Sequence, residues 1–280
     1  MNRLKQEIKH LFNLINEPEM KILPAHLAFF MVLSIIPIIT LIAYVATLFR
    51  VPLNALIDTM QGVLPSAVSD ILLPIINGEG LSATIGISMI VVFFLASNGT
   101  HSIIVASNTM YGIKHSNYFI RRLKALILIV ILILLIIFNL VVIAFGNNIV
   151  NWILELKILS AVSPALYELF ILLKWPCSLL FIFFLIKLVY TIAPDSKIPS
   201  MYTNKGAAFT TVLWSLATMI YSFYVTNFTH YDLFYGSLTN IIVMMIWIYI
   251  LSYILIFGMA VNASNYKIEM SLEENTNKED

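Results

Sequence analysis

The stretch Tyr231–Ala263 reads YDLFYGSLTNIIVMMIWIYILSYILIFGMAVNA, and it decides the fold class. After Asp232 the chain carries no charged residue until Lys267. A helix needs roughly 20 apolar residues to cross the hydrocarbon core of a bilayer, and this stretch exceeds that length. A water-soluble fold would have to bury such a helix on every side, whereas a membrane helix needs only lipid and a few neighbours. The stretch therefore predicts an integral membrane protein.

The composition of the whole chain agrees with this prediction. Of the 280 residues, 60% are hydrophobic and 11% are charged, against about 25% charged in an average soluble domain. The net charge of +1 gives no basic field that would attract nucleic acid, so no nucleic-acid partner is expected. Cys177 is the single cysteine, which excludes an intrachain disulfide. The first apolar run, Leu27–Phe49, is longer than the core of a signal peptide, so we expect it to be a retained helix.

Four motifs follow one another along the chain: HLAFFMVLSIIPIITL (26–41), TIAPDSKIP (191–199), Gly206-Ala207 ahead of Trp214, and Tyr235-Gly236-Ser237-Leu238 at the start of the last apolar run. In these motifs and their order, the chain resembles the YihY/BrkB family of bacterial inner-membrane proteins. Some members of that family carry an older label, ribonuclease BN. The resemblance covers about residues 20–266 and implies six transmembrane helices and a function at the membrane.

We expect an all-α, polytopic membrane protein in three parts. These are a cytoplasmic amphipathic segment (1–26), a six-helix membrane domain (27–266) and a disordered cytoplasmic tail (267–280). The expected membrane helices cover about 27–48, 81–106, 125–145, 165–190, 206–226 and 240–263.

Two further segments have helical spacing but do not predict a spanning helix. Residues 2–17 combine apolar and basic positions, which favours a helix on the cytoplasmic membrane surface or one packed on the protein. Prolines and glycines interrupt residues 50–80, which indicates two short surface helices or a re-entrant hairpin.

The distribution of Lys and Arg predicts the topology. With the N-terminus inside, twelve of these residues fall in inside segments and two in outside segments. The positive-inside rule then places both termini in the cytoplasm. The family resemblance implies that the membrane is the cytoplasmic (inner) membrane of a bacterial cell. The inside set is Arg3, Lys5, Lys9, Lys21, Lys114, Arg121, Arg122, Lys124, Lys197, Lys205, Lys267 and Lys278; the outside set is Arg50 and Lys157.

Two prolines are expected to kink predicted helices. Pro37 frees the carbonyl of Leu33, and Ser34 is close enough to help satisfy the opened turn. Pro176 weakens the helix around Lys174 in the same way.

Lys174 is the first candidate for a functional contact. An intramembrane lysine costs about 2.5–3.5 kcal/mol at a helix centre, so it often marks a pathway, here for an anion. Alternatively, its long stem lets the ammonium group reach the outer membrane surface.

A polar stripe in the second predicted helix is the second candidate. Asn98, His101, Ser102 and Asn108 share one helical face within roughly 120°. Asn98, His101 and Asn108 are candidate contacts along a pathway, and His101 can carry a proton between pH 5 and 8. Hydrogen bonding between helices would explain the same residues, as it would Asn139 and Asn262.

The outer loop at 228–238 is the third candidate, because His230, Tyr231, Asp232 and Tyr235 cluster at the membrane edge. The tyrosines also suit the aromatic belt at the bilayer interface, which is a structural role.

Nothing in the sequence indicates an enzyme. The five histidines are scattered and have no metal-ligand spacing. The sequence also contains no glycine-rich phosphate loop and no set of metal-binding acids. We therefore expect no catalytic residues, no metal site, no cofactor and no ribonuclease activity.

The sequence favours transport or translocation of a lipid, an amphiphile or a small solute across the membrane. The expected partners are membrane lipids and a lipid or anionic small-molecule substrate, with the oligomeric state open. The alternative is a non-transporting scaffold for envelope assembly. A transporter should show a polar cavity reaching Asn98, His101 or Lys174, whereas a scaffold should show polar groups hydrogen-bonded in pairs.

Overall fold

The computed structural model describes residues 16, 18–48, 85–114, 116–155, 163–228 and 238–279. The predictions for residues 2–17, 50–80 and 228–238 fall almost wholly outside these ranges. The described elements are α2 (Pro18–Leu48), α5 (Ile85–Tyr111), α6 (Tyr118–Glu155), α7 (Ser163–Ile192), the short 3-10 helix η2 (Ser200–Thr203), α8 (Asn204–Phe228) and α10 (Thr239–Glu279). No strand occurs in the described ranges, and the all-α prediction is confirmed.

Within the described ranges, four helical segments are long and apolar enough to cross a bilayer. They are Pro18–Ile35 of α2, Ile90–Tyr111 of α5, Ser200–Val225 of η2 and α8, and Thr239–Ile268 of α10. The other two predicted spans fall in α6 and α7, which are also helical. A count of six spans stays a prediction.

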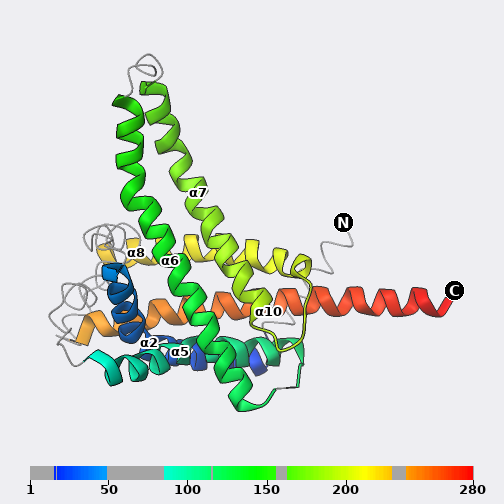
Figure 1. Ribbon diagram of the computed structural model, residues 1–280. Coiled ribbons are helices and arrows are strands. Elements are labelled where there is room, and N and C mark those ends of the chain that lie inside the picture. The colour runs from blue at the N-terminus through cyan, green and yellow to red at the C-terminus, as the bar shows by residue number, and fades with distance from the viewer. Residues whose placement is uncertain are drawn as a thin grey trace.

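Three helices extend well beyond the predicted bounds, and one of them is α6, which covers Tyr118–Glu155 against an expected 125–145. α2 begins at Pro18 rather than near Leu27, because proline is well tolerated in the first helical turn, where its missing N–H costs nothing. Glu19 in that turn suits the positive end of the helix dipole. α10 continues to Glu279 through the tail that was expected to be disordered, and its last turns project past the other helices (Figure 1). Glu and Lys, which favour helix, are frequent in this part of the chain.

The helices form two groups in space (Figure 1). α5, α8 and α10 run along a common direction, and α2 packs against α5 and α10. α6 and α7 form an antiparallel pair that crosses this group and extends past it. Pro37 lies inside α2, and the last part of that helix turns away from its first part.

The largest buried cluster sits where α5, α7, α8 and α10 meet the start of α2. Its most completely buried members are Leu27, Ile104, Ile186, Tyr190, Ile256 and Met259. Outward positions carry large apolar side chains, as expected of surfaces that face lipid, among them Ile90, Phe119, Val212, Met219 and Phe223.

Candidate functional site

Four polar residues join the α5–α6 connection to the loop after α7, and we call them the Asp195 cluster: Asn108, Ser116, Lys124 and Asp195. Asn108 is fully buried; its Nδ2 donates to Asp195 Oδ2 at 2.6 Å, and its Oδ1 accepts the Asp195 amide at 2.8 Å. Ser116 donates to the same carboxylate oxygen from its amide (3.1 Å) and its hydroxyl (2.9 Å). The cluster therefore fixes two connections that lie at the same end of the bundle.

Lys124 completes this cluster from the second turn of α6. Its Nζ lies 3.2 Å from Asp195 Oδ1, and it donates to the carbonyls of Ala193 (3.0 Å) and Pro194 (2.5 Å). One cation thus neutralises the carboxylate and satisfies two backbone acceptors just beyond the end of α7.

The pKa of Asp195 is lowered by this arrangement. Burial alone would raise the pKa, but hydrogen bonds from Ser116, Asn108 and Lys124 favour the ionised form and outweigh burial. The ionised carboxylate of Asp195 therefore has a structural role in the loop after α7.

The polar stripe of α5 meets three different neighbours. Ser102 Oγ lies 3.0 Å from His26 Nδ1 of α2, and Thr100 Oγ1 donates to the carbonyl of Ala125 in α6 at 2.8 Å. Asn98 accepts a hydrogen bond from Arg122 of α6, and Asn108 contacts the loop after α7. Each of these contacts joins α5 to another element.

Arg122 was counted only as an inside charge in the sequence, yet its guanidinium lies against the middle of α5. Its side chain is 8% exposed, and Nη1 donates to Asn98 Oδ1 at 2.9 Å while Nη2 donates to the Phe94 carbonyl at 2.5 Å. The guanidinium carbon stands 3.6 Å from the centre of the Phe94 ring, a cation–π contact. A periodicity argument could have placed Arg122 on the inner face of α6, but not at this contact.

His101 lies next to this arginine. Its ring packs edge-on to Tyr118 with centroids 5.9 Å apart, and its Nε2 is buried without a hydrogen-bond partner among the described residues. His101 is also within electrostatic range of Arg121 and Arg122.

Ser34 behaves differently from its expected role in the Pro37 turn. Its hydroxyl donates to the Leu95 carbonyl (3.2 Å) and accepts the Gly99 amide (2.9 Å), both in α5. These two backbone groups are four residues apart and would pair with each other in a regular helix. The Ser34 hydroxyl of α2 therefore contacts the backbone of the neighbouring helix.

α8 and α10 touch through glycines. Asn262 of α10 accepts the Gly206 amide at 2.7 Å, which confirms its expected contact between helices. A Cβ at Gly206 would overlap the Gly258 carbonyl and the Asn262 side chain. Further along, Tyr190 of α7 bonds to Thr210 and to the Leu255 carbonyl, both at 2.7 Å.

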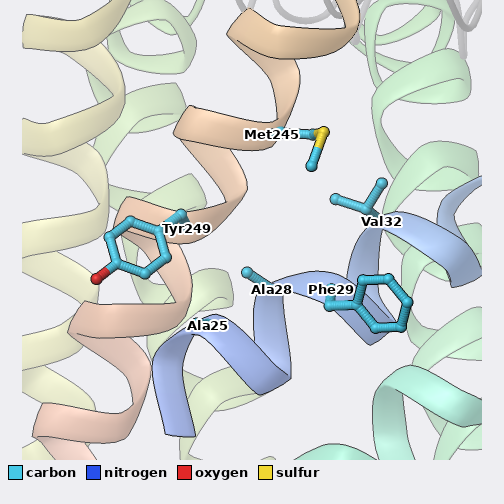
Figure 2. A pocket seen from close by; sticks show the side chains of 6 residues that line it. All are labelled: Ala25, Ala28, Phe29, Val32, Met245 and Tyr249. Atoms are coloured by element: carbon cyan, nitrogen blue, oxygen red, sulfur yellow. The ribbon is translucent and has the colours of Figure 1, made fainter. Parts of the chain in front are cut away.

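A groove of about 220 Å³ lies between α2 and α10 (Figure 2). α2 contributes two small and two larger apolar side chains, and α10 contributes Met245 and Tyr249. Phe29, Met245 and Tyr249 are half exposed, so the groove opens sideways, toward the surface that meets lipid. The residues from α2 are Ala25, Ala28, Phe29 and Val32.

The remaining predicted site residues lie in helices away from these contacts. Lys174 and Pro176 are in α7, and the side chain of Lys174 is outside the described part of the structure, as is that of Asn139 in α6. The part that Lys174 plays therefore stays a prediction. Over the described ranges, no group of three or more His, Cys, Asp or Glu side chains is placed to hold a metal ion.

The structure combines long apolar helices, outward surfaces of large apolar side chains, and polar contacts between helices. These features define a polytopic membrane protein. The chain belongs to the family described as Virulence factor BrkB, whose model matches residues 12–280. This confirms the family resemblance drawn from the four motifs, and it confirms the membrane location.

Two relatives match most of the chain. YfkH of Bacillus subtilis, which bears the description ribonuclease-like, is 28% identical over 96% of this chain and 98% of its own. A UPF0761 membrane protein of Vibrio parahaemolyticus is 24% identical over 91% of this chain and 81% of its own. A UPF0761 membrane protein of Vibrio campbellii is 31% identical over 41% of this chain and 36% of its own. No solved structure matches the chain.

Proposed function

We propose that this protein moves a lipid, an amphiphile or a small solute across the cytoplasmic membrane, using six transmembrane helices with both termini inside. The observation that carries the proposal is the sideways-opening apolar groove between α2 and α10. Both helices have apolar spans of membrane length, so the groove meets the acyl chains of the bilayer. An acyl chain is the occupant whose chemistry matches its lining.

The polar part of such a substrate needs a different path. In this conformation the α5 stripe is engaged with α2, α6 and the loop after α7. Passage of a head group along α5 requires these contacts to open, so the structure corresponds to a closed state of the proposed transporter.

The orientation rests on the distribution of cations. Lys21 at the start of α2, Lys114 after α5, Lys124 in α6, Lys205 in α8 and Lys267 in α10 belong to one end of the bundle. The positive-inside rule assigns this end to the cytoplasm.

A translocation assay tests the proposal. The full chain is reconstituted into liposomes that contain NBD-labelled phosphatidylglycerol, and the fraction of probe protected from dithionite is followed over time. The wild type should move the probe between leaflets faster than protein-free liposomes. Ala25→Phe, which fills the rim of the groove from an exposed position, should reduce this rate several-fold.

Val212→Phe is the control, because it also places a phenylalanine at an exposed position, in α8 and away from the groove. It should leave the rate unchanged. Wild-type protein that moves neither this probe nor entrapped small solutes, with or without an ion gradient, would contradict transport.

A scaffold for envelope assembly is the second candidate, and the paired polar groups of α5 favour it. Asn98, Ser102 and Asn108 all have partners on other elements, as a bundle without a pathway requires. A scaffold should co-purify with envelope-assembly proteins after crosslinking in intact cells and be inactive in the liposome assay. Ribonuclease activity is not proposed, because the description of YfkH belongs to that protein.

A further inference from the structure

Two cationic side chains, Arg121 and Arg122, and the imidazole of His101 lie where the start of α6 packs against α5, and we call these three residues the cationic corner. Arg122 is nearly buried, and both arginines are within electrostatic range of His101. These residues were not singled out together by their positions in the sequence, because the corner forms only when α6 folds back across α5.

The charges of the corner are not neutralised by carboxylates in the described part of the chain. The ion pair found there joins Lys124 to Asp195, and Asp195 is already bonded by Asn108 and Ser116. A buried guanidinium without a counter-ion is costly, so the corner favours an external anion.

The corner also offers nitrogen atoms that suit an oxyanion. The Nε atoms of Arg121 and Arg122 and the Nε2 atom of His101 are buried, and none has a hydrogen-bond partner among the described residues. His101 donates from Nε2 when that atom carries the proton, and the arginines always donate. Phosphate oxygens accept several such bonds, and guanidinium groups match their geometry well.

The position of the corner points to the membrane interface. Large apolar side chains of the first α6 turns face outward beside the arginines: Tyr118, Phe119, Ile120 and Leu123 are 50–78% exposed. The arginines lie three to four residues into α6, about 5–6 Å along its axis. Basic pockets between membrane helices at this depth on the cytoplasmic side suit anionic head groups.

We propose that the cationic corner binds the phosphate group of an anionic ligand, either the head group of a lipid or a free phosphate anion. Arg121 and Arg122 supply charge and donors, and His101 supplies a further donor. This inference holds for a transporter and for a scaffold, because a bound lipid can be cargo or a structural partner.

The test measures lipid selectivity by native mass spectrometry of the full chain. Wild-type protein is equilibrated in mixed micelles with equal amounts of phosphatidylglycerol and phosphatidylcholine, and retained lipids are counted. For a lipid ligand we expect preferential retention of phosphatidylglycerol, reduced at least fivefold in Arg121→Gln and less strongly in His101→Gln.

The choice of variants keeps the fold intact. Arg121 bonds to the Ser116 carbonyl, whereas Arg122 holds two groups of α5, so Arg121→Gln is the gentler change. Arg122→Lys keeps the positive charge but removes the planar guanidinium group, so it should give an intermediate loss of lipid retention. Lys205→Gln removes an exposed cation from the first turn of α8 and should retain lipid as the wild type does.

Inorganic phosphate separates the two sources of the ligand. Thermal unfolding is followed in phosphate and in chloride at equal ionic strength. Stabilisation of the wild type but not of Arg121→Gln, without selective lipid retention, identifies a free anion. Selective lipid retention without a phosphate effect identifies the lipid.

Two results overturn the inference. One is the absence of both lipid selectivity and phosphate stabilisation in the wild type. The other is an equal loss of retention in Lys205→Gln and Arg121→Gln, which indicates diffuse attraction to the basic end of the bundle. Neither result bears on transport, which the liposome assay measures separately.

Discussion

Asn108 and Asp195 hold each other through two hydrogen bonds that run in opposite directions. The amide nitrogen of Asn108 donates to the carboxylate at 2.6 Å, and its oxygen accepts the Asp195 backbone amide at 2.8 Å. The two residues are 87 positions apart, so this exchange joins the end of α5 to the loop after α7. It also gives Asn108, a candidate for a pathway contact, a specific structural partner.

Asn108→Ala should destabilise the protein by about 2–3 kcal/mol, because it removes the acceptor of the Asp195 amide and one of the donors to the Asp195 carboxylate. For a domain of this size the melting temperature should fall by roughly 4–12 °C. Thermal unfolding of the detergent-solubilised protein measures the change. Asn227→Ala is the control, since Asn227 is exposed and bonds within its own helix; equal losses in the two variants would contradict the role of Asn108.

The Asp195 cluster should make stability depend on acidic pH. Because the pKa of Asp195 is below its ordinary value of 3.8, its contribution is complete above that value and is lost as pH falls toward the folded-state pKa. The melting temperature of the wild type should therefore fall below about pH 4. Asp195→Asn should have a lower melting temperature at pH 7 and a flatter profile at acidic pH; parallel profiles would contradict this assignment.

The glycines of α8 and α10 should not tolerate a methyl group. At Gly258 a Cβ would overlap Thr210 Oγ1 and the Tyr190 hydroxyl, so Gly258→Ala should cost about 1–3 kcal/mol. Gly99→Ala is a matched control, because its nearest neighbour, Ser34 Oγ, would be 3.4 Å away, an ordinary contact. The control should change little or gain up to about 1 kcal/mol in helix propensity. Similar melting temperatures for the two variants would show that the helices do not touch here.

Ser34→Ala should have only a small effect, about 0.5–1 kcal/mol, despite the full burial of Ser34. Without the hydroxyl, the Gly99 amide and the Leu95 carbonyl are still partners of each other in a regular helix. Thermal unfolding gives the cost, and hydrogen exchange at Gly99 reports how well its amide stays protected. A cost near 3 kcal/mol would show that these two backbone groups depend on Ser34.

The predicted topology can be read by thiol labelling. Cys177→Ser removes the single native thiol, and single cysteines are then introduced by Lys114→Cys, Lys197→Cys and Lys157→Cys. An impermeant maleimide should label the Lys157 position in intact cells and the other two only after the membrane is opened. Labelling of Lys114→Cys in intact cells would show that the orientation is the opposite of the predicted one.

The helices were predictable because a long apolar run has one physical solution in a bilayer. The observed ends of α7 and α8 lie within two residues of the expected ones, whereas α6 is longer than expected at both ends. The start at Pro18 and the continuation to Glu279 were missed, because polar and charged residues at helix ends resemble those of loops. A prediction from the length of apolar runs does not detect that these polar turns continue the helices.

The contacts of the site were less predictable, because each depends on which helix lies beside α5. The stripe of Asn98, Ser102 and Asn108 was visible in the sequence, but its three different partners were not. In the sequence, Lys124 is one of the cations counted for the topology, and Asp195 is part of the TIAPDSKIP motif. Nothing in the sequence indicates that the two residues form an ion pair. The contact of Ser34 with the α5 backbone has no signal in sequence spacing, because it depends on how closely two helices approach.

The close approach of α8 and α10 determines which parts of the molecule can move. At Gly206 and Gly258 the two helices meet backbone to backbone, and farther along Trp214 donates to the Leu251 carbonyl and Tyr221 to the Val243 carbonyl. A helix held in this way cannot roll about its axis or slide past its neighbour without a collision. α8 and α10 therefore form one unit, and relative motion within the described bundle has to displace α2, α5 or the α6–α7 pair against that unit.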